Sequence, residues 1–377
     1  MTPAVLSELT AGGVSLWLDD LDRTRLESAS DQSTVDPRGL QYLIHNRAIR
    51  GVTTNPTIFD RAVGSGSAAY MEQLAQLGRD GIDVDDAITA VTTEDVRAAC
   101  DELLPMWDAT GGLDGRVSIE VDPRLAHDTD ATIDQAQVLW DIVDRPNAMI
   151  KIPATTSGLP AISQVLARGI SVNVTLIFSV DRYREVMAAH LDGLRLAHAA
   201  GLELSRIESV ASFFVSRVDT AVDAVLDAMS TPEAARLRGS AAIANATMAW
   251  HAYEQHTGAD DWRQLSAAGA RPQRPLWAST GVKDPAYDPA RYVVGLAAPG
   301  CVNTVPEATL HAVADSATYL GDTMSGRAPE AQQTLRDLRS LGVDLNGVCA
   351  DLEAAGVASF IDSWLGLRET VTRALAR

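Results

Sequence analysis

Short apolar runs alternate with longer segments of helical periodicity along the whole chain. Most runs are bounded by glycine, proline or acidic residues, which is typical of strands buried on both faces. Seven strands are expected at Val14–Leu18, Gly51–Thr54, Arg116–Val121, Ala148–Ile152, Ile170–Phe178, Ile207–Phe214 and Arg274–Thr280. An eighth run falls at Tyr292–Ala297 or Cys301–Thr304, and we favour the second as the eighth strand.

Between these runs, apolar residues recur three and four positions apart, as on one face of an α-helix. Thr93 is a candidate helix start, because acidic residues follow it in what would be the first turn. From Ala308 to the C-terminus the pattern is helical, with interruptions expected near Gly342 and Gly356. The other helices are expected at Arg38–Arg50, Ala68–Leu77, Ala87–Leu104, Ala131–Val143, Gly158–Ala167, 180–200, Val218–Met229 and Ala234–His256.

Strands that alternate with helices predict an α/β protein with a parallel sheet. Eight such units favour a (β/α)8 TIM barrel with additional helices, notably at the C-terminus. A doubly wound open sheet is the competing fold, but no G-x-G-x-x-G turn follows the first strand and no Walker-type loop is present. Because no linker is visible, we expect one domain over residues 1–377, with helices from about 308 packing on the barrel.

Polar side chains gather at the carboxyl ends of the expected strands. In a (β/α)8 barrel this end carries the chemistry, because the loops after the strands form one rim. The residues concerned are Asp19, Asn55, Glu120, Lys151, Asn173, Thr175, Ser212, Arg217 and Ser279.

Lys151 is the most informative of these residues. The 31 basic residues comprise 29 arginines and only two lysines, Lys151 and Lys283, so arginine serves wherever a positive charge is enough. A lysine inside an apolar strand can lose its proton in a desolvated pocket and form a Schiff base with a carbonyl, which a guanidinium cannot do. The alternative is a lysine whose amine reaches solvent at the strand end.

Schiff-base chemistry needs groups that move protons near the amine. Asp19 could be the direct acid/base, and Glu120 could hold a catalytic water together with Thr175. Each carboxylate could instead cap a helix or form a structural ion pair. Asn55 and Asn173 could bind substrate hydroxyls, although Asn55 before a proline is also typical of a turn.

Arg217, shortly after the sixth strand, is a candidate phosphate ligand. The segment Ala278–Lys283 could add hydroxyl, backbone and cationic contacts to the same phosphate. The alternative for any one arginine in this chain is a solvated surface position.

The amino-acid composition limits the classes of partner and the cellular compartment that are expected. Hydrophobic residues make up 46% of the 377 residues, enough for a large core, and the net charge is −19. Such a charge argues against nucleic acid or an anionic membrane as partner.

Three widely spaced cysteines, Cys100, Cys301 and Cys349, suggest neither a disulfide framework nor a metal site. With no visible signal peptide and no apolar run of about 18 residues, a reduced cytoplasmic protein is expected.

Six segments together resemble the transaldolase family, in its longer bacterial subtype within the class I aldolase superfamily. They occur in the family's order and cover most of the chain. They are Gly51–Phe59 (GVTTNPTIF), Ser118–Asp130 (SIEVDPRLAHDTD), Met149–Thr155 (MIKIPAT), Ile170–Phe178 (ISVNVTLIF), Val210–Asp219 (VASFFVSRVD) and Trp277–Pro285 (WASTGVKDP).

The resemblance implies transfer of a dihydroxyacetone unit from sedoheptulose 7-phosphate to glyceraldehyde 3-phosphate, in the non-oxidative pentose phosphate pathway. No metal or organic cofactor is implied, and the partners are phosphorylated sugars; a monomer or a homodimer is possible. By motif, the catalytic residues fall on Lys151 (Schiff base), Asp19, Glu120 and Thr175. The substrate-binding positions fall on Asn55, Asn173, Ser212, Phe214, Arg217 and Ser279.

Two departures and two alternatives follow from the resemblance. Many members read Ala-Ser-Phe-Arg or Ala-Ser-Phe-Lys where this chain reads Ala-Ser-Thr-Gly, so Lys283 becomes the candidate for the second phosphate-binding cation. The adjacent Asp20 leaves the choice of acid/base to the alignment of the first strand.

A fructose 6-phosphate aldolase is the nearest alternative, although such relatives tend to carry Gln at the position of Glu120 and Tyr at the position of Phe214. The second alternative function is that of a catalytically inactive barrel that senses sugar phosphates.

Overall fold

The computed structural model describes residues 2–27 and 36–376. Eight parallel strands form a closed barrel in sequence order, with each strand beside the next and β8 beside β1. The predicted (β/α)8 barrel is therefore confirmed, with Cys301–Thr304 rather than Tyr292–Ala297 marking its last strand. The strands are β1 (Ser15–Leu18), β2 (Ile49–Thr53), β3 (Arg116–Glu120), β4 (Ala148–Pro153), β5 (Val172–Ile177), β6 (Ser209–Phe214), β7 (Arg274–Ala278) and β8 (Val302–Val305).

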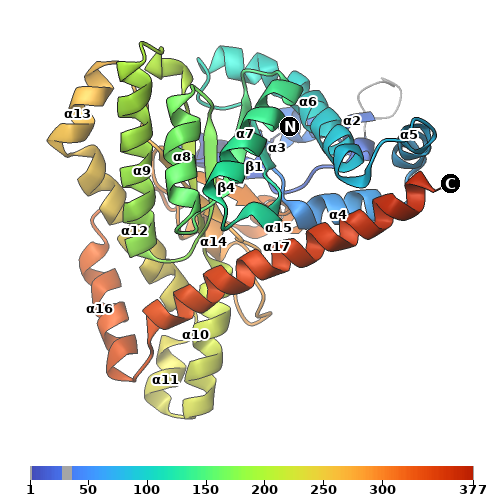
Figure 1. Ribbon diagram of the computed structural model, residues 1–377. Coiled ribbons are helices and arrows are strands. Elements are labelled where there is room, and N and C mark those ends of the chain that lie inside the picture. Colours follow the sequence, from blue (N-terminus) through green and yellow to red (C-terminus); the bar gives the residue numbers. More distant parts are fainter. Residues whose placement is uncertain (1, 28–35, 377) are drawn as a thin grey trace.

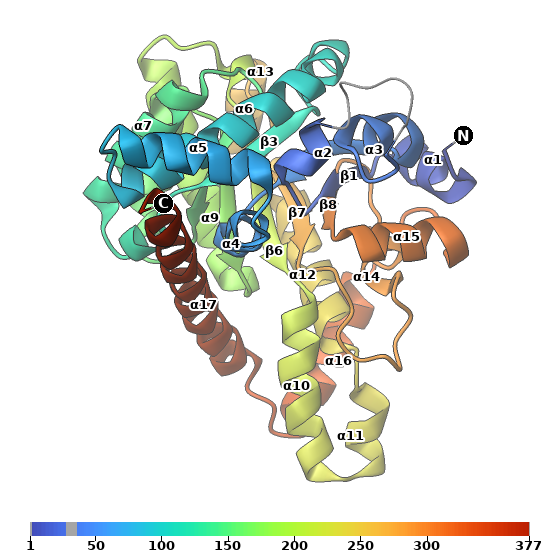
Figure 2. The ribbon, with the colours of Figure 1, turned by 90° about the vertical axis from the view of Figure 1, so that its right-hand side faces the viewer.

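Helices surround the barrel and cover the outer faces of its strands (Figure 1). Helices α10 and α11 project beyond the rest of the molecule (Figures 1 and 2). The helices are α1 (Ala4–Ala11), α2 (Arg23–Glu27), α3 (Leu40–Arg47), α4 (Pro56–Gly64), α5 (Ala68–Arg79), α6 (Val84–Ala109), η1 (Pro123–Leu125), α7 (Thr129–Val143), α8 (Gly158–Ala167), α9 (Val180–Ala199), η2 (Leu204–Arg206), α10 (Ser216–Met229), α11 (Pro232–Leu237), α12 (Ala241–Thr257), α13 (Asp260–Ala267), α14 (Arg291–Val294), α15 (Glu307–Ser316), α16 (Ala328–Ser340) and α17 (Leu345–Leu375).

Two boundaries around β2 differ from the expectation. The helix expected over Arg38–Arg50 ends at Arg47, because Ala48 adopts a left-handed φ of 55° and the chain turns directly into β2. The sequence suggested a turn at Asn55-Pro56. Instead Pro56 is the first residue of α4, where a missing N–H costs nothing, and the Asn55 side chain caps that helix.

Two further helix predictions were wrong. Thr93 does not start a helix: α6 begins nine residues earlier, capped by Asp83, and the Thr93 hydroxyl donates to the Thr89 carbonyl within the helix. The single helix expected over Ala234–His256 is divided into α11 and α12, because Gly239 takes a positive φ of 66° between them.

The longest helix, α17, contradicts the interruption expected near Gly356. It runs unbroken over 31 residues from Leu345 to Leu375, whereas the predicted break near Gly342 is present before it. Helix α17 crosses the molecule diagonally and lies against α4 and α5 near the C-terminus (Figures 1 and 2). Within the described residues, no helix has both the length and the apolar character needed to cross a membrane.

The interior of the barrel is filled below the rim. Trp17 is fully buried against Gly51, where an added Cβ would come within 2.7 Å of the indole. The opposite, amino-terminal end of the barrel holds buried charge: Arg274 pairs with Asp114 at 3.2 Å and lies 3.9 Å from Glu208. Open space for a ligand is therefore left at the carboxyl end, as the barrel fold predicts.

Candidate active site

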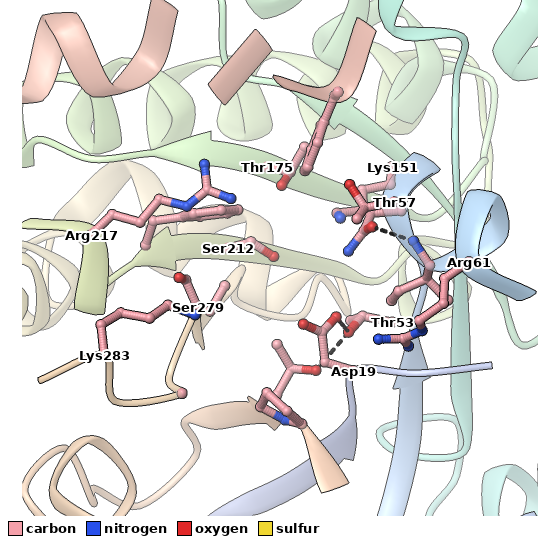
Figure 3. Close-up of a pocket in the computed structure, with 18 residues that line it drawn as sticks. Asp19, Thr53, Thr57, Arg61, Lys151, Thr175, Ser212, Arg217, Ser279 and Lys283 are labelled. Atoms are coloured by element: carbon pink, nitrogen blue, oxygen red, sulfur yellow. Dashed lines mark hydrogen bonds between the residues drawn. The ribbon is translucent and has the colours of Figure 1, made fainter. Parts of the chain in front are cut away.

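A cavity of about 300 Å³ opens among the carboxyl ends of the strands (Figure 3). Nine of the eleven residues predicted as site residues line it. These nine are Asp19, Asn55, Lys151, Thr175, Ser212, Phe214, Arg217, Ser279 and Lys283. The other two, Glu120 and Asn173, lie beside Lys151 in register on the neighbouring strands β3 and β5.

Lys151 projects from β4 with only 5% of its side chain exposed. Its Nζ lies 3.0 Å from Glu120 Oε2 and donates a hydrogen bond of 3.0 Å to the Thr54 carbonyl. The ring of Phe360, from α17, has its centroid 5.6 Å from the same Nζ. The amine is thus held at a buried point between a carboxylate, a carbonyl and an aromatic face.

Glu120 and Thr175 flank the lysine as buried polar groups. Burial raises the pKa of the Glu120 carboxyl, and the positive charge of Lys151 opposes that rise. Among the described residues, Thr175 Oγ1 has no hydrogen-bond partner. Buried hydroxyls nearly always form a hydrogen bond with protein, water or a ligand. Thr175 is therefore suited to bind a water molecule or a ligand.

Two positions at the rim adopt left-handed backbone conformations without being glycine. Leu176 has φ 60° directly after Thr175, where the pairing of β5 with β6 shifts register, and Ser279 has φ 54° after β7. Such residues cost on the order of 1–3 kcal/mol each and concentrate at functional sites. Here Ser279 lines the cavity itself, and Leu176 directly follows Thr175, which also lines it.

The structure distinguishes Asp19 from Asp20. Asp19 lines the cavity and accepts a 2.8 Å hydrogen bond from Thr53 Oγ1. Burial raises the pKa of the Asp19 carboxyl, again opposed by the charge of Lys151. Asp20 instead forms ion pairs with Arg25, at 2.7 Å, and with Arg61. Only Asp19 is placed to exchange a proton with a molecule in the cavity.

The predicted amide and hydroxyl ligands form a hydrogen-bonded chain. Ser212 donates to Asn173 Oδ1 at 2.7 Å, and Asn173 donates to Ser118 at 3.0 Å. Asn55 combines both interpretations made from sequence, since its Oδ1 accepts from Ile58 N at 3.0 Å while the residue lines the cavity. The hydrogen bonds with Ser212 and Ser118 fix the orientation of the Asn173 amide.

Arg217, Ser279 and Lys283 gather on one side of the cavity, away from Lys151 (Figure 3). The Arg217 guanidinium lies 5.4 Å above the Phe214 ring, and burial lowers its pKa without removing its charge. No ion pair forms at Arg217 or Lys283 within residues 2–27 and 36–376. Two cations without a carboxylate partner, beside a hydroxyl, are suited to a phosphate group.

A comparison with known families agrees with this geometry. The model of the transaldolase/fructose-6-phosphate aldolase family matches residues 16–371. The chain belongs to this family.

Individual relatives are similar over nearly their whole lengths. The protein named Transaldolase from Acidothermus cellulolyticus is 54% identical over 372 residues, which cover 99% of this chain and 97% of the relative. Proteins of the same name from Mycobacterium tuberculosis (strain ATCC 25618 / H37Rv) and Mycolicibacterium smegmatis are each 56% identical, over 95% of this chain and 94% of the relative.

Several residues of this transaldolase-family cavity were missed in the sequence. Thr53 is the last residue of β2 and Thr304 lies near the end of β8, and their positions near the carboxyl ends of strands could have identified them. Thr57 and Arg61 on α4, and Phe360 on α17, carry no such signal because helices bring them to the rim. The sequence therefore identified the strand contribution to the site better than the helix contribution.

Proposed function

We propose that this protein is a transaldolase, which transfers a dihydroxyacetone unit from sedoheptulose 7-phosphate to glyceraldehyde 3-phosphate through a Schiff base on Lys151. The products are erythrose 4-phosphate and fructose 6-phosphate. The observation that carries the proposal is a single cavity that has the buried Lys151 amine, paired with Glu120, at one side and, within the described residues, two cations without an ion pair at the other. The names of the relatives support the same reaction.

Lys151 acts as the nucleophile in this proposal. Its neutral amine attacks the C2 carbonyl of the ketose, and the resulting carbinolamine loses its hydroxyl as water to give an iminium. Glu120, 3.0 Å from the amine, and Thr175 hold the water that carries these protons. The raised pKa of Glu120 brings the carboxyl closer to the pH at which it both accepts and donates a proton.

Asp19 acts as the second acid/base. It takes the proton from the C4 hydroxyl as the C3–C4 bond breaks, which releases the aldehyde and leaves an enamine on Lys151. The enamine then attacks the acceptor aldehyde, and Asp19 returns the proton to the new hydroxyl. Thr53 holds the Asp19 carboxylate in place through its 2.8 Å hydrogen bond.

The remaining cavity residues bind the substrate. Asn55, Asn173 and Ser212 contact its hydroxyls, and Phe214 forms a wall. Arg217, Ser279 and Lys283 bind the phosphate. Gly281 stands where many family members carry a cation; an added Cβ there would meet nothing closer than 3.5 Å, so the space is open for the Lys283 side chain.

Other parts of the proposal concern the setting of the enzyme. We propose one domain over the whole chain, no metal or organic cofactor, and a role in the non-oxidative pentose phosphate pathway. A cytoplasmic location is consistent with three free cysteines, Cys100, Cys301 and Cys349. We propose a monomer or a homodimer, and no nucleic-acid partner, since the net charge is −19.

Dependence on an aldehyde acceptor tests the proposal. The full chain is given fructose 6-phosphate with or without erythrose 4-phosphate, and sedoheptulose 7-phosphate and free dihydroxyacetone are measured. A transaldolase forms sedoheptulose 7-phosphate and releases little dihydroxyacetone without acceptor. Release at equal rates in both cases would indicate an aldolase, which the presence of Glu120 and Phe214 argues against. No turnover of fructose 6-phosphate in either case would favour an inactive barrel that senses sugar phosphates.

A further inference from the structure

The C-terminal helix α17 reaches the active site although it follows the last strand by some forty residues. It is fixed to the rim of the barrel on both sides of Phe360. Before Phe360, Glu353 pairs with Arg182 at the start of α9, at 3.3 Å. After it, Ser363 shares a 2.7 Å hydrogen bond with Thr57 of α4.

Two further contacts hold the following turns of α17. The Arg124 guanidinium lies 5.9 Å from the centroid of the Trp364 ring, and Arg368 pairs with Asp85 on α6. Because Arg124 also pairs with Asp85, the helix is tied to the loop after β3 and to α6 together. Helix α17 is thus positioned by contacts with four separate parts of the barrel.

Gly356 sets how closely α17 approaches the barrel. An added Cβ at Gly356 would lie 2.9 Å from Leu176 Cδ2, so any side chain there would require Leu176 or the helix to move. One turn further along, Phe360 is 4% exposed, lines the cavity and lies over the Lys151 amine at 5.6 Å. The close approach at Gly356 therefore places an aromatic ring against the reacting nitrogen.

We propose that Phe360 is a specificity-determining residue that decides whether the lysine-bound three-carbon unit passes to an aldehyde or is lost to water. The inference rests on the proposed Schiff-base function. Glu120 and the Thr54 carbonyl occupy other directions around the amine, and the Phe360 ring closes the direction of α17. Its π face also stabilises a positive charge on the nitrogen, as in the iminium.

Two routes leave the enamine intermediate. In transfer, the enamine carbon forms a bond to the acceptor carbonyl, the carbonyl oxygen takes the proton from Asp19, and hydrolysis of the new iminium releases a longer ketose. In loss, the enamine carbon is protonated instead, water adds to the iminium carbon, and the C–N bond breaks to give dihydroxyacetone and free Lys151. Shielding by Phe360 slows the second route at its first step, because a proton from bulk water must reach the enamine carbon, whereas hydrolysis of the iminium in either route uses the water held by Glu120 and Thr175.

The test measures the ratio of dihydroxyacetone released to sedoheptulose 7-phosphate formed, with fructose 6-phosphate as donor and limiting erythrose 4-phosphate. Phe360→Ala removes the ring, and Phe360→Leu keeps apolar bulk without a π face. Leu367→Ala is the matched control, because Leu367 is buried on the same helix at 1% exposure but does not line the cavity. Borohydride trapping on Lys151 accompanies each protein.

Phe360→Ala should raise the ratio at least about fivefold, because the space left by the ring lets water approach the enamine; this factor corresponds to about 1 kcal/mol in the relative barriers of the two routes. Phe360→Leu should raise it at least about twofold, and it carries the test if the alanine variant does not fold. Leu367→Ala should match the wild type. An unchanged ratio in a folded Phe360 variant that still forms the Lys151 adduct would overturn this inference alone. Absence of the adduct in the wild type would overturn the proposed function and this inference with it.

Discussion

Removal of either unpaired cation should weaken binding of the substrate phosphate without impairing the chemistry at Lys151. Arg217 and Lys283 line the cavity on the side away from the lysine, and neither has a carboxylate partner among the described residues. A charge-assisted hydrogen bond contributes about 1.5–3 kcal/mol. Arg217→Gln or Lys283→Gln should therefore raise KM for fructose 6-phosphate by about 10- to 150-fold, with a much smaller change in kcat.

Unphosphorylated fructose isolates the phosphate contribution, because its reaction uses the same lysine and acid/base groups. The kcat/KM for fructose should change by less than about threefold in either variant. Arg61→Gln is the matched control: Arg61 also lines the cavity, but it pairs with Asp20 and its side chain is 67% exposed. Surface ion pairs of this kind contribute about 0–1 kcal/mol.

Because both cations would contact one phosphate, their effects should be coupled, so the double variant should lose less than the product of the two single losses. Equal losses of kcat/KM for fructose and for fructose 6-phosphate would refute the assignment. An Arg61→Gln effect as large as that of Lys283→Gln would show that position in the cavity, and not the absence of a partner, determines phosphate binding.

Three further predictions concern the acid/base group, the C-terminal helix and stability. Asp19→Asn should lower kcat by about 10²- to 10⁴-fold, whereas Asp20→Asn should lower it less than about tenfold; the opposite order in steady-state assays would exchange their roles. Deletion of Asp362–Arg377 removes buried side chains of α17 and should weaken phosphate-substrate binding or lower Tm, so unchanged kinetics and melting would contradict it. Burial lowers the pKa of His190 to about 3. Below about pH 6.5, therefore, only the unfolded state binds a proton at this residue, and the free energy of unfolding decreases as the pH is lowered. Between pH 7 and 5, His190→Leu should lose about 2 kcal/mol less than the wild type in urea unfolding, and identical pH profiles would exclude this cause.

The strand part of this protein could be predicted because its signal is local. Each strand is a short, largely apolar run with a polar residue near or directly after its carboxyl end, so Lys151, Asp19 and Thr175 were found before their partners were known. The closed barrel then brings these ends together, and the register pairs Lys151 with Glu120 and Asn173. The fold, and nine of the residues that line the cavity, therefore followed from sequence.

The helix part could not be predicted to the same degree, because its cause is tertiary contact. Gly356 suggested a helix break by its intrinsic propensity, but the structure uses its missing side chain for close packing on Leu176. Phe360 is one apolar residue among many in an amphipathic segment, and only the path of α17 brings it to Lys151. Likewise, Asp19 and Asp20 are distinguished by partners from elsewhere in the chain, since Thr53 donates to Asp19 while Arg25 and Arg61 pair with Asp20.

Chemical trapping on Lys151 tests the central claim most directly. The protein is incubated with fructose 6-phosphate, reduced with borohydride and mapped by mass spectrometry, with Lys151→Arg treated in parallel. Because Lys283 is the only other lysine, the assignment of the adduct is unambiguous. The proposal predicts a dihydroxyacetone-sized adduct on Lys151 that is absent from the variant. A folded wild-type protein with no adduct, or with the adduct on Lys283, would contradict the Schiff-base function.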